Sequence, residues 1–347
     1  MAKVFVGMSG GVDSTAAAAI LKEQGHEVTG LTLKLLDDAS RCCDYEDILD
    51  ARRACWKLGI KHYVLNLKRD FKKKIVDYFI SEYVKGRTPN PCVLCNEEIK
   101  FAALIKKMKE HNYDYVATGH YAAIENKKGV FSLKKAADKK KTQEYFLSRL
   151  KKEDLKYIKF PLGNMRKEKA RLIVKKHGLK FDKSESQEVC FLKKGETPFE
   201  FIERHVDLKK TGRGELFSTA GVKLKDLDYA YFKYTIGQRK GLGMGGGDAL
   251  YVSSIDADKK HVIAGSRETV YRKEFIADDL NMFSSGLKGG FRADVKIRYK
   301  SRPAKAKIEI KGGMAHVVFD EPQFAVTPGQ LAVFYKGAAV IGSGFIL

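Results

Sequence analysis

Cysteine is scarce in this chain, and so are long apolar runs and acidic side chains. Its six cysteines among 347 residues lack the spacing of a disulfide-bonded secreted scaffold. The longest apolar stretch near the start, TAAAAIL, is far below the roughly 20 residues that a membrane-spanning helix needs. Asp13 and Ser14 interrupt any signal-peptide core. These absences predict a cytoplasmic protein without membrane association, in which reduced thiols remain available for chemistry.

The shortage of acidic side chains leaves a large positive charge. Lys and Arg number 65 against 43 Asp and Glu, a formal charge of +22. Self-repulsion of this size disfavours the compact state, and a polyanionic partner relieves it. Nucleic acid is the favoured partner because neutralised phosphates release their counterions. The alternative is a lysine-rich solvated surface without a binding role.

The length favours two or three domains. Strand and helix patterns alternate over the first third, from KVFVGM through STAAAAILKEQG to YDYVATGHYAAI, which predicts a doubly wound parallel α/β sheet. Near residue 210 glycine becomes frequent and helical periodicity disappears, and VKIRY, AKAKIEI, AHVVF and LAVFY predict antiparallel strands. We expect a catalytic α/β domain at 1–204, a small β-rich domain at 205–280 and a C-terminal antiparallel β-barrel at 281–347.

A basic segment near the middle, NMRKEKARLIVKKHG at 164–178, has helical amphipathic spacing. Its lysines and arginines fall on one side of the predicted helix, and a run of charges of this kind is most often a solvated face. We therefore expect this helix to present its basic side chains to solvent.

The stretch GMSGGVDS, from Gly7 to Ser14, follows the first predicted strand and opens the first predicted helix. Backbone N–H groups of such a loop, serine hydroxyls and the positive end of the helix dipole together favour a phosphate group. The stretch lacks the Gly-Lys-Ser/Thr ending of a Walker A loop and the spacing of a dinucleotide fingerprint. It resembles the SGGxDS signature of the ATP pyrophosphatases, which cleave ATP between the α and β phosphates and transfer AMP to a carbonyl or amide oxygen.

That resemblance implies an ATP site on the loop. Asp13 is implied to act on the pyrophosphate through Mg²⁺ or by fixing the loop. Two further positions fall at the rim of the predicted sheet, where an adenosine would lie. The predicted ATP-binding residues are Gly7, Met8, Ser9, Gly10, Gly11, Val12, Asp13, Ser14, Leu33 and Gly119.

Two thiols three positions apart occur in TPNPCVLCNEEIKF, directly before a predicted helix. At the amino end of that helix the dipole would lower the pKa of Cys95 and raise its reactivity. A structural zinc site needs four ligands, and no second C-x-x-C exists, so zinc is disfavoured. Cys190, in KSESQEVCFL, is by its residues alone either a small buried side chain or a reactive thiol.

Seven separated motifs resemble, in order, those of the tRNA-specific 2-thiouridylases, bacterial enzymes that modify the wobble uridine. They run from residue 3 to the end and read GMSGGVDS, GRTPNPCVLCNEEIKF, ATGHYA, SQEVCF, FKYTIGQRKGLG, VKIRYKS and VVFDEPQFAVTPGQLAVFY. The resemblance implies that Cys190 carries the incoming sulfur as a persulfide. It also implies that Cys95 is the nucleophile or resolving thiol.

The implied reaction explains these residue types. Adenylating the C2 oxygen of uracil turns it into a good leaving group, and the terminal sulfur on Cys190 then displaces AMP. Cys95 either attacks the S–S bond directly or releases hydrosulfide, and a Cys95–Cys190 disulfide remains to be reduced. Because the two cysteines are 95 positions apart, we expect the SQEVC loop to move over the site when tRNA binds. The implied partners are ATP with Mg²⁺, tRNA of the Lys, Glu and Gln type, and a protein that donates persulfide sulfur.

The resemblance also implies contacts with the target base and the tRNA. At two positions the chain departs from many relatives. Thr142-Gln143-Glu144 stands where they have Asp-Gln-Ser, and Cys92 stands where they have Asp. The implied contacts are Asn90, Pro91 and Cys92 with the target base, His120 beside the substrate, and Lys141, Thr142, Gln143, Arg298, Tyr299 and Gln330 with tRNA.

Alternatives remain for mechanism and function. Cys92, Cys95 and Cys190 could hold a [4Fe–4S] cluster with one open iron, which would replace the persulfide route. Another ATP pyrophosphatase with a small-molecule substrate, or a non-catalytic RNA-binding module, would explain the separated thiols less well. Cys42 and Cys43 have no predicted role, Cys55 is expected in a helix core, and the sequence does not specify the oligomeric state.

Overall fold

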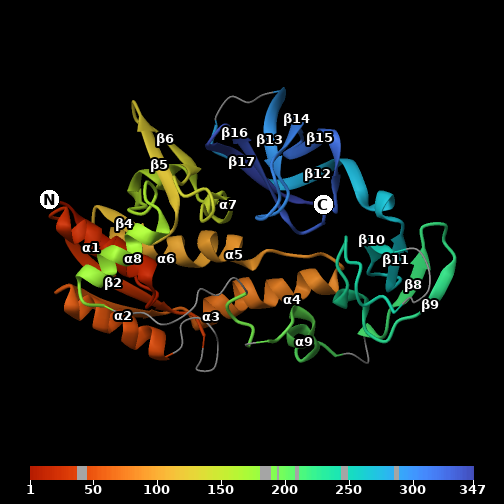
Figure 1. The fold of residues 1–347 in the computed structure, drawn as a ribbon, viewed down its shortest axis with the longest axis horizontal. Helices are drawn as coiled ribbons and strands as arrows, with labels where there is room; N and C mark the ends of the chain where they lie inside the picture. Colours follow the sequence, from red (N-terminus) through yellow and green to blue (C-terminus); the bar gives the residue numbers. More distant parts are fainter. Residues whose placement is uncertain (37–44, 180–188, 194, 208–210, 244–248, 285–288) are drawn as a thin grey trace. The chain divides into compact units, whose positions relative to one another are not determined.

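The computed structural model describes the whole chain apart from residues 37–44, 180–188, 194, 208–210, 244–248 and 285–288 (Figure 1). Contacts within the chain define two compact units. The first comprises Met1–Val76, Pro91–Lys194 and Gly337–Ile341, and the second comprises Asp77–Asn90, Gly195–Lys336 and Gly342–Leu347. The predictions for Cys42, Cys43 and the SQE residues of the SQEVC loop fall outside the described residues.

The first unit is built on a parallel sheet with strand order β3-β2-β1-β4-β7. Its strands are β1 (Lys3–Gly7), β2 (Glu27–Lys34), β3 (Lys61–Asn66), β4 (Tyr115–Thr118) and β7 (Ile158–Lys159). The interiors of β1 and β2 are apolar and buried, as expected for parallel strands covered on both faces. The strand order reverses direction between β1 and β4, so a crevice opens there at the carboxyl ends of the strands.

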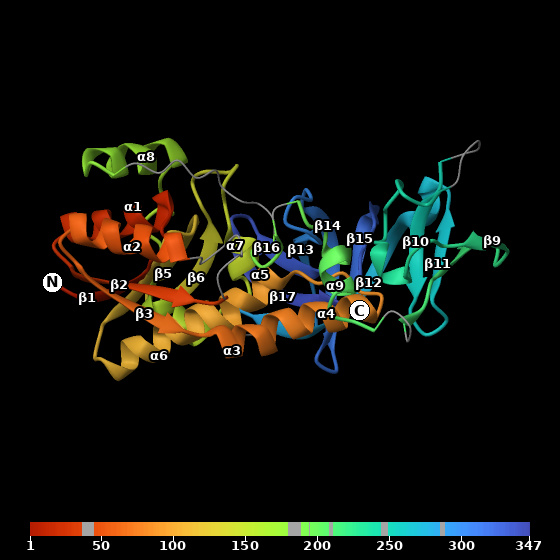
Figure 2. The same ribbon diagram turned by 90° about the horizontal axis from the view of Figure 1, so that it is seen from below.

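Helices cover both faces of this sheet. Figure 2 shows α1 (Val12–Glu23) and α2 (Tyr45–Lys57) on one face and α6 (Ala102–Glu110) on the other, with α8 (Lys167–Lys176) packed against α1. The alanine run of α1 lets the helix approach the strands closely, and residues 14–21 are all buried. The core on this face includes Val4, Val6, Leu21, Val28 and Leu58.

A long helical run leads into α6. It begins with α5 (Pro91–Leu94), continues as the π-helical η2 (Cys95–Phe101) and passes into α6. Leu94 and Ala102, at the two joints, both have right-handed helical backbone angles. The prediction that the helix begins after Cys95 is therefore wrong. Proline fits the first position of a helix because its φ is already set, so the helix begins at Pro91.

Shorter elements complete the first unit. They are α3 (Lys68–Phe71), η1 (Lys72–Val76), the hairpin β5 (Ala122–Lys127) and β6 (Val130–Lys135), α7 (Glu144–Leu147) and η3 (Lys152–Tyr157). Two of them pack near the long helical run, because both α3 and α7 contact η2.

The second unit opens with α4 (Asp77–Val84) and α9 (Pro198–Glu203). A capping box starts α9, in which Thr197 and Glu200 bond each other's backbone N–H. A mixed sheet of order β10-β11-β8-β9 follows. It contains β8 (Glu215–Ser218), β9 (Lys223–Asp226), β10 (Tyr251–Asp256) and β11 (His261–Gly265), with the short helices η4 (Tyr231–Lys233) and η5 (Arg267–Val270) beside it in sequence.

Six antiparallel strands end the chain. They are β12 (Tyr271–Met282), β13 (Gly290–Lys296), β14 (Ala304–Lys311), β15 (Met314–Phe324), β16 (Leu331–Lys336) and β17 (Ala339–Ile346). The order is β12-β15-β14-β13-β16-β17, and β17 pairs back onto β12 from Ala277↔Ile346 to Met282↔Gly342, so the sheet closes into a barrel. The predicted fold class, a parallel α/β domain followed by a β-rich middle and an antiparallel barrel, is confirmed. In the described part of the chain no helix is both long and apolar enough to span a membrane.

Candidate active site

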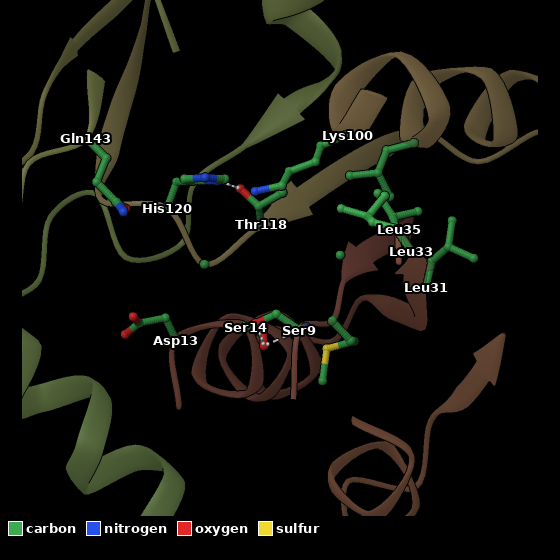
Figure 3. Close-up of a pocket in the computed structure, with 14 residues that line it drawn as sticks. Ser9, Asp13, Ser14, Leu31, Leu33, Leu35, Lys100, Thr118, His120 and Gln143 are labelled. Carbon is green, nitrogen blue, oxygen red and sulfur yellow. Dashed lines mark hydrogen bonds between the residues drawn. The ribbon is translucent and has the colours of Figure 1, made fainter. Parts of the chain in front are cut away.

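A pocket lies at the carboxyl ends of β1, β2 and β4, where the strand order reverses (Figure 3). The predicted ATP-binding and substrate residues that line it are Gly7, Met8, Ser9, Asp13, Ser14, Leu33, Gly119, His120 and Gln143. Five further residues complete the lining, namely Leu31, Leu35, Lys100, Leu104 and Thr118. The fold thus gathers residues from five separate stretches of sequence, and the assignment of the predicted residues to ATP stays a prediction.

The amino end of α1 faces this pocket without a side-chain cap. Gly11 is the N-cap residue and has no side chain with which to cap the first-turn N–H groups. Such groups, together with the helix dipole, favour a phosphate. The Ser14 hydroxyl donates to the Gly11 carbonyl at 3.1 Å and accepts from the Ser9 N–H at 3.2 Å, which orders the loop. Gly10 has φ +73°, and a Cβ there would lie 2.4 Å from the Asp47 carbonyl oxygen.

Both oxygens of Asp13 are engaged by one buried lysine. The Lys167 ammonium, 5% exposed, donates to them at 2.8 and 2.7 Å, and the Tyr121 hydroxyl donates to one of them at 2.9 Å. The prediction that the basic helix at 164–178 presents a solvated face is wrong at Lys167, because α8 packs against α1 and turns this side chain inward. Lys167 and Tyr121 therefore hold the Asp13 side chain in place, and its role toward Mg²⁺ stays a prediction.

Gly119 touches the start of α1. A Cβ built on it would lie 2.5 Å from the Asp13 carbonyl carbon and 2.6 Å from the Ser14 nitrogen. Backbone atoms cannot rotate away as a flexible side chain does, so a larger residue would have to displace the first turn of α1. The end of β4 and the phosphate-favouring loop are therefore positioned by direct backbone contact.

Replacing Gly119 with alanine should weaken ATP binding by about 10-fold or more and cost about 1–3 kcal/mol of stability through overpacking. Calorimetric titration with ATP and urea unfolding would measure the two effects. Gly290→Ala is the matched control, since its Cβ would meet only side-chain atoms, none closer than 3.4 Å. Unchanged ATP affinity in Gly119→Ala would show that the contact does not position the loop.

His120 stands at the pocket as a neutral imidazole. Its Nδ1 lies 2.8 Å from the Thr118 hydroxyl, and Figure 3 shows Lys100 directed toward both residues. Although the residue keeps some solvent exposure, desolvation of the ring, with a smaller contribution from the Lys100 charge, lowers the pKa of His120 to about 3. His120 can therefore offer a hydrogen bond to a substrate at neutral pH but does not carry a positive charge.

The lowered pKa of His120 predicts a stability that falls on acidification. Between pH 3 and 6.5 the unfolded state binds a proton that the folded state rejects, so stability rises with pH across that window. When the pH drops from 7.5 to 5, we expect the free energy of unfolding of the wild type to fall by about 1 to 2 kcal/mol relative to that of His120→Asn. Urea unfolding at both pH values measures it. An equal difference at the two values would contradict the shifted pKa.

Sequence reasoning missed Lys100. It lies on η2, the π-helical segment that begins at Cys95, and reaches the pocket beside His120. Nothing in the sequence distinguishes it from the many other lysines, because its place depends on where the helical run meets the sheet. Lys100 brings a positive charge to the pocket that faces the uncapped amino end of α1, and it ties the Cys95 helix to that pocket.

The two predicted catalytic thiols lie outside the pocket lining. Cys95 is 4% exposed, whereas Cys190 is partly exposed. Phe191, next to Cys190, packs edge-on against Phe71 of α3 with ring centroids 6.0 Å apart, and α3 in turn contacts η2. The residue after Cys190 thus packs on α3, and α3 contacts η2, the segment that begins with Cys95.

The remaining described cysteines differ in environment. Burial in α2 raises the pKa of Cys55 to about 12, so this thiol stays protonated and belongs to the helix core. Within the residues that the structure describes, no three His, Cys, Asp or Glu side chains are grouped so as to hold a metal ion. Cys92, Cys95 and Cys190 therefore do not form a preassembled cluster site in this conformation.

Family models and related proteins match almost the whole length of the chain. Family models described as the tRNA methyl transferase HUP domain, the tRNA methyl transferase PRC-barrel domain and the aminomethyltransferase beta-barrel domain match residues 2–194, 200–266 and 272–346. The tRNA-specific 2-thiouridylase MnmA of Acetivibrio thermocellus is 44% identical over 358 residues, which cover 99% of each chain. The chain belongs to the tRNA-specific 2-thiouridylase family.

Other relatives bear the same name. The tRNA-specific 2-thiouridylase MnmA of Clostridioides difficile is 42% identical, and the match covers 99% of this chain and 98% of that protein. The tRNA-specific 2-thiouridylase MnmA of Halothermothrix orenii is 43% identical, and the match covers 100% of this chain and 99% of that protein. A solved NMN synthetase from Francisella tularensis covers 53% of this chain and 66% of its own at 20% identity. The TM-score of this match is 0.36.

In this 2-thiouridylase, the stretch implied to contact tRNA at 141–143 is tied into the first unit. The Gln143 side-chain oxygen accepts from the Tyr121 N–H at 2.8 Å. Thr142 accepts from the Ala136 N–H at 2.8 Å and donates to the carboxylate of Glu144, which is 1% exposed. Thr142 and Glu144 are therefore hydrogen-bonded to each other.

Two implied tRNA contacts in the barrel also have internal roles. The Arg298 guanidinium donates to the Ala325 carbonyl, at a residue with φ +54°. The Gln330 side chain donates to the Thr88 carbonyl at 2.6 Å. Tyr299 has the Lys296 ammonium 5.4 Å from its ring centre. All of these contacts lie within the second unit, and the proposed contact with tRNA stays a prediction.

Proposed function

We propose that this chain catalyses ATP-dependent 2-thiolation of the wobble uridine of tRNA, with Cys190 delivering sulfur as a persulfide and Cys95 completing the transfer. The observation that carries the proposal is the pocket in which the uncapped amino end of α1 faces Lys100, on the helical run that contains Cys95. Family membership over 99% of the chain supports the same reaction. One helical segment, η2, therefore carries both Cys95 and a lysine that lines the pocket.

The first half of the reaction activates the base. The C2 oxygen of uracil attacks the α-phosphorus of ATP, an O–P bond forms, and pyrophosphate leaves with the electron pair of the broken bond. The first-turn N–H groups of α1 and the Lys100 ammonium are suited to hold phosphate oxygens. Lys167 fixes Asp13, and with it the loop that carries these N–H groups.

The second half exchanges oxygen for sulfur. The terminal persulfide sulfur on Cys190 attacks C2, and AMP leaves with the former uracil oxygen. The Cys95 thiolate then attacks the Cys190 sulfur, so the bond to the transferred sulfur breaks and its electron pair stays on that sulfur as 2-thiouridine forms. A Cys95–Cys190 disulfide remains, and an external thiol must reduce it before the next turnover.

The partners follow from this scheme. The substrates are ATP, with Mg²⁺ as its usual counter-ion, and tRNAs of the Lys, Glu and Gln type. The sulfur comes from a protein that carries a persulfide. A formal charge of +22 supports binding of a polyanion of tRNA size. The described residues contain no preassembled group of three ligands that would hold a [4Fe–4S] cluster.

The proposal is tested by incubating the protein with ATP, Mg²⁺, a persulfide source and a tRNA transcript, with and without an iron chelator. Mass analysis of digested tRNA should show 2-thiouridine at the wobble position, and AMP should form in equal amount. A transcript with cytidine at that position should give neither product. AMP formation that needs no tRNA would favour a small-molecule synthetase, and loss of product with the chelator would favour the cluster.

A further inference from the structure

The helical run at Pro91 carries a pair of thiols on one side. Cys92 lies in the first turn of α5, and Cys95 follows one turn later at the start of η2. Leu94 between them has φ −64° and ψ −36°, so the helix is unbroken. Residues three apart on a helix have Cβ atoms about 5–6 Å from each other, and a disulfide needs its Cβ atoms about 3.5–4.5 Å apart. The turn between Cys92 and Cys95 therefore has to tighten by roughly 1–2 Å to join the two sulfurs.

The two thiols differ in access and in electrostatic setting. Cys95 is 4% exposed, whereas Cys92 is partly exposed. Cys92 is also nearer to the amino end of the run, where the N–H groups and the dipole favour a thiolate. After one turnover the sulfur of Cys95 would be held in a buried disulfide that an external thiol reaches poorly. Cys92 is already within reach of that sulfur.

We propose, building on the proposed function, that Cys92 opens the Cys95–Cys190 disulfide after each sulfur transfer. The Cys92 thiolate attacks the Cys95 sulfur, a Cys92–Cys95 bond forms, and the Cys95–Cys190 bond breaks with its electron pair leaving on Cys190. The exchange is balanced, since one thiolate and one disulfide give another thiolate and another disulfide. Cys190 is released to accept the next sulfur. The oxidised pair is moved to the more exposed Cys92, where an external dithiol reduces it.

The other cysteines do not compete for this role among the described residues. Cys55 is buried in α2, and its pKa of about 12 keeps it protonated at neutral pH. An aspartate at position 92 could not exchange with a disulfide, because it has no thiolate. The relay is thus a property of chains that, like this one, have cysteine at both positions of the pair.

A single-turnover experiment on the full-length protein tests the relay. The protein is loaded with persulfide, mixed with ATP, Mg²⁺ and wobble-uridine tRNA without reductant, quenched in acid, alkylated and digested for peptide mass analysis. Wild type should yield the Cys92–Cys95 disulfide with Cys190 alkylated. Cys92→Ser and Cys92→Asp should each yield the Cys95–Cys190 disulfide instead. Disulfide is counted per 2-thiouridine formed, so the readout does not depend on the rate.

The outcomes separate the relay from the reaction on which it rests. In wild type, a Cys95–Cys190 disulfide with Cys92 alkylated would overturn the relay and leave the proposed function intact. Formation of 2-thiouridine with no disulfide at all would overturn both. The wild-type pattern decides the matter by itself, even where a Cys92 variant folds poorly.

Discussion

Cys95→Ser and Cys190→Ser should each reduce formation of 2-thiouridine by about 10³-fold or more. A serine hydroxyl at position 190 cannot carry a transferable sulfur, and one at position 95 cannot attack the S–S bond to release it. The barrier to sulfur transfer is therefore no longer lowered in either variant. Mass analysis of nucleosides from treated tRNA measures the loss. Filter binding should still show tRNA affinity in both variants, because phosphate contacts supply most of it.

The two variants should fail at different points. Cys190→Ser cannot accept persulfide, so no sulfur reaches the base. Cys95→Ser accepts the persulfide, and the terminal sulfur on Cys190 still attacks C2. Because the S–S bond to Cys190 is then not broken, a covalent protein–tRNA adduct should accumulate, and dithiothreitol should cleave it. Cys55→Ala is the control, since Cys55 is buried in α2 and is not among the residues that line the pocket. Full activity in either serine variant would refute the assignment.

Asp13→Ala should destabilise the protein by about 3 kcal/mol or more, because it leaves the buried Lys167 ammonium without its carboxylate. Lys167→Met should cost less, since the Asp13 carboxylate is 31% exposed and keeps the Tyr121 hydroxyl. Both variants should reduce tRNA-dependent AMP formation by about 10²-fold, because the loop that holds the phosphates is no longer fixed. Urea unfolding and an AMP assay measure these effects.

The double variant Asp13→Ala with Lys167→Met separates the loss of stability from the loss of activity. With neither charge left, no ion is buried without a partner, so most of the lost stability should return. AMP formation should stay low, because the loop still lacks its anchor. If the stability losses of the single variants simply add in the double variant, the two side chains do not interact as the structure shows.

The nucleotide loop was predictable because its determinants are local. A buried strand, a glycine-rich turn and an alanine-rich helix follow one another between residues 3 and 23, and their joint geometry needs no distant residue. Leu33 and Gly119 could be added because parallel strands end at one edge of a sheet. For the same reason, the pocket lies at the carboxyl ends of β1 and β4, where the strand order reverses.

The residues that sequence reasoning missed act over long separations. Lys167 reaches Asp13 from 154 positions away, and amphipathic spacing alone does not reveal that one lysine of a basic helix turns inward. Lys100 depends on the packing of the Cys95 helix. The early helix start at Pro91 does not follow from the sequence, because proline suits both an extended loop and the first position of a helix.

The most direct test of the account follows the oxygen atom that sulfur replaces. A tRNA or anticodon stem-loop is made with ¹⁸O at C2 of the wobble uridine and is turned over with unlabelled ATP and persulfide-loaded protein. If the base is activated by AMP transfer, the released AMP should contain one ¹⁸O atom for each 2-thiouridine formed. Unlabelled AMP alongside normal thiolation would contradict the account, because the oxygen would then have left without ever being bonded to the nucleotide.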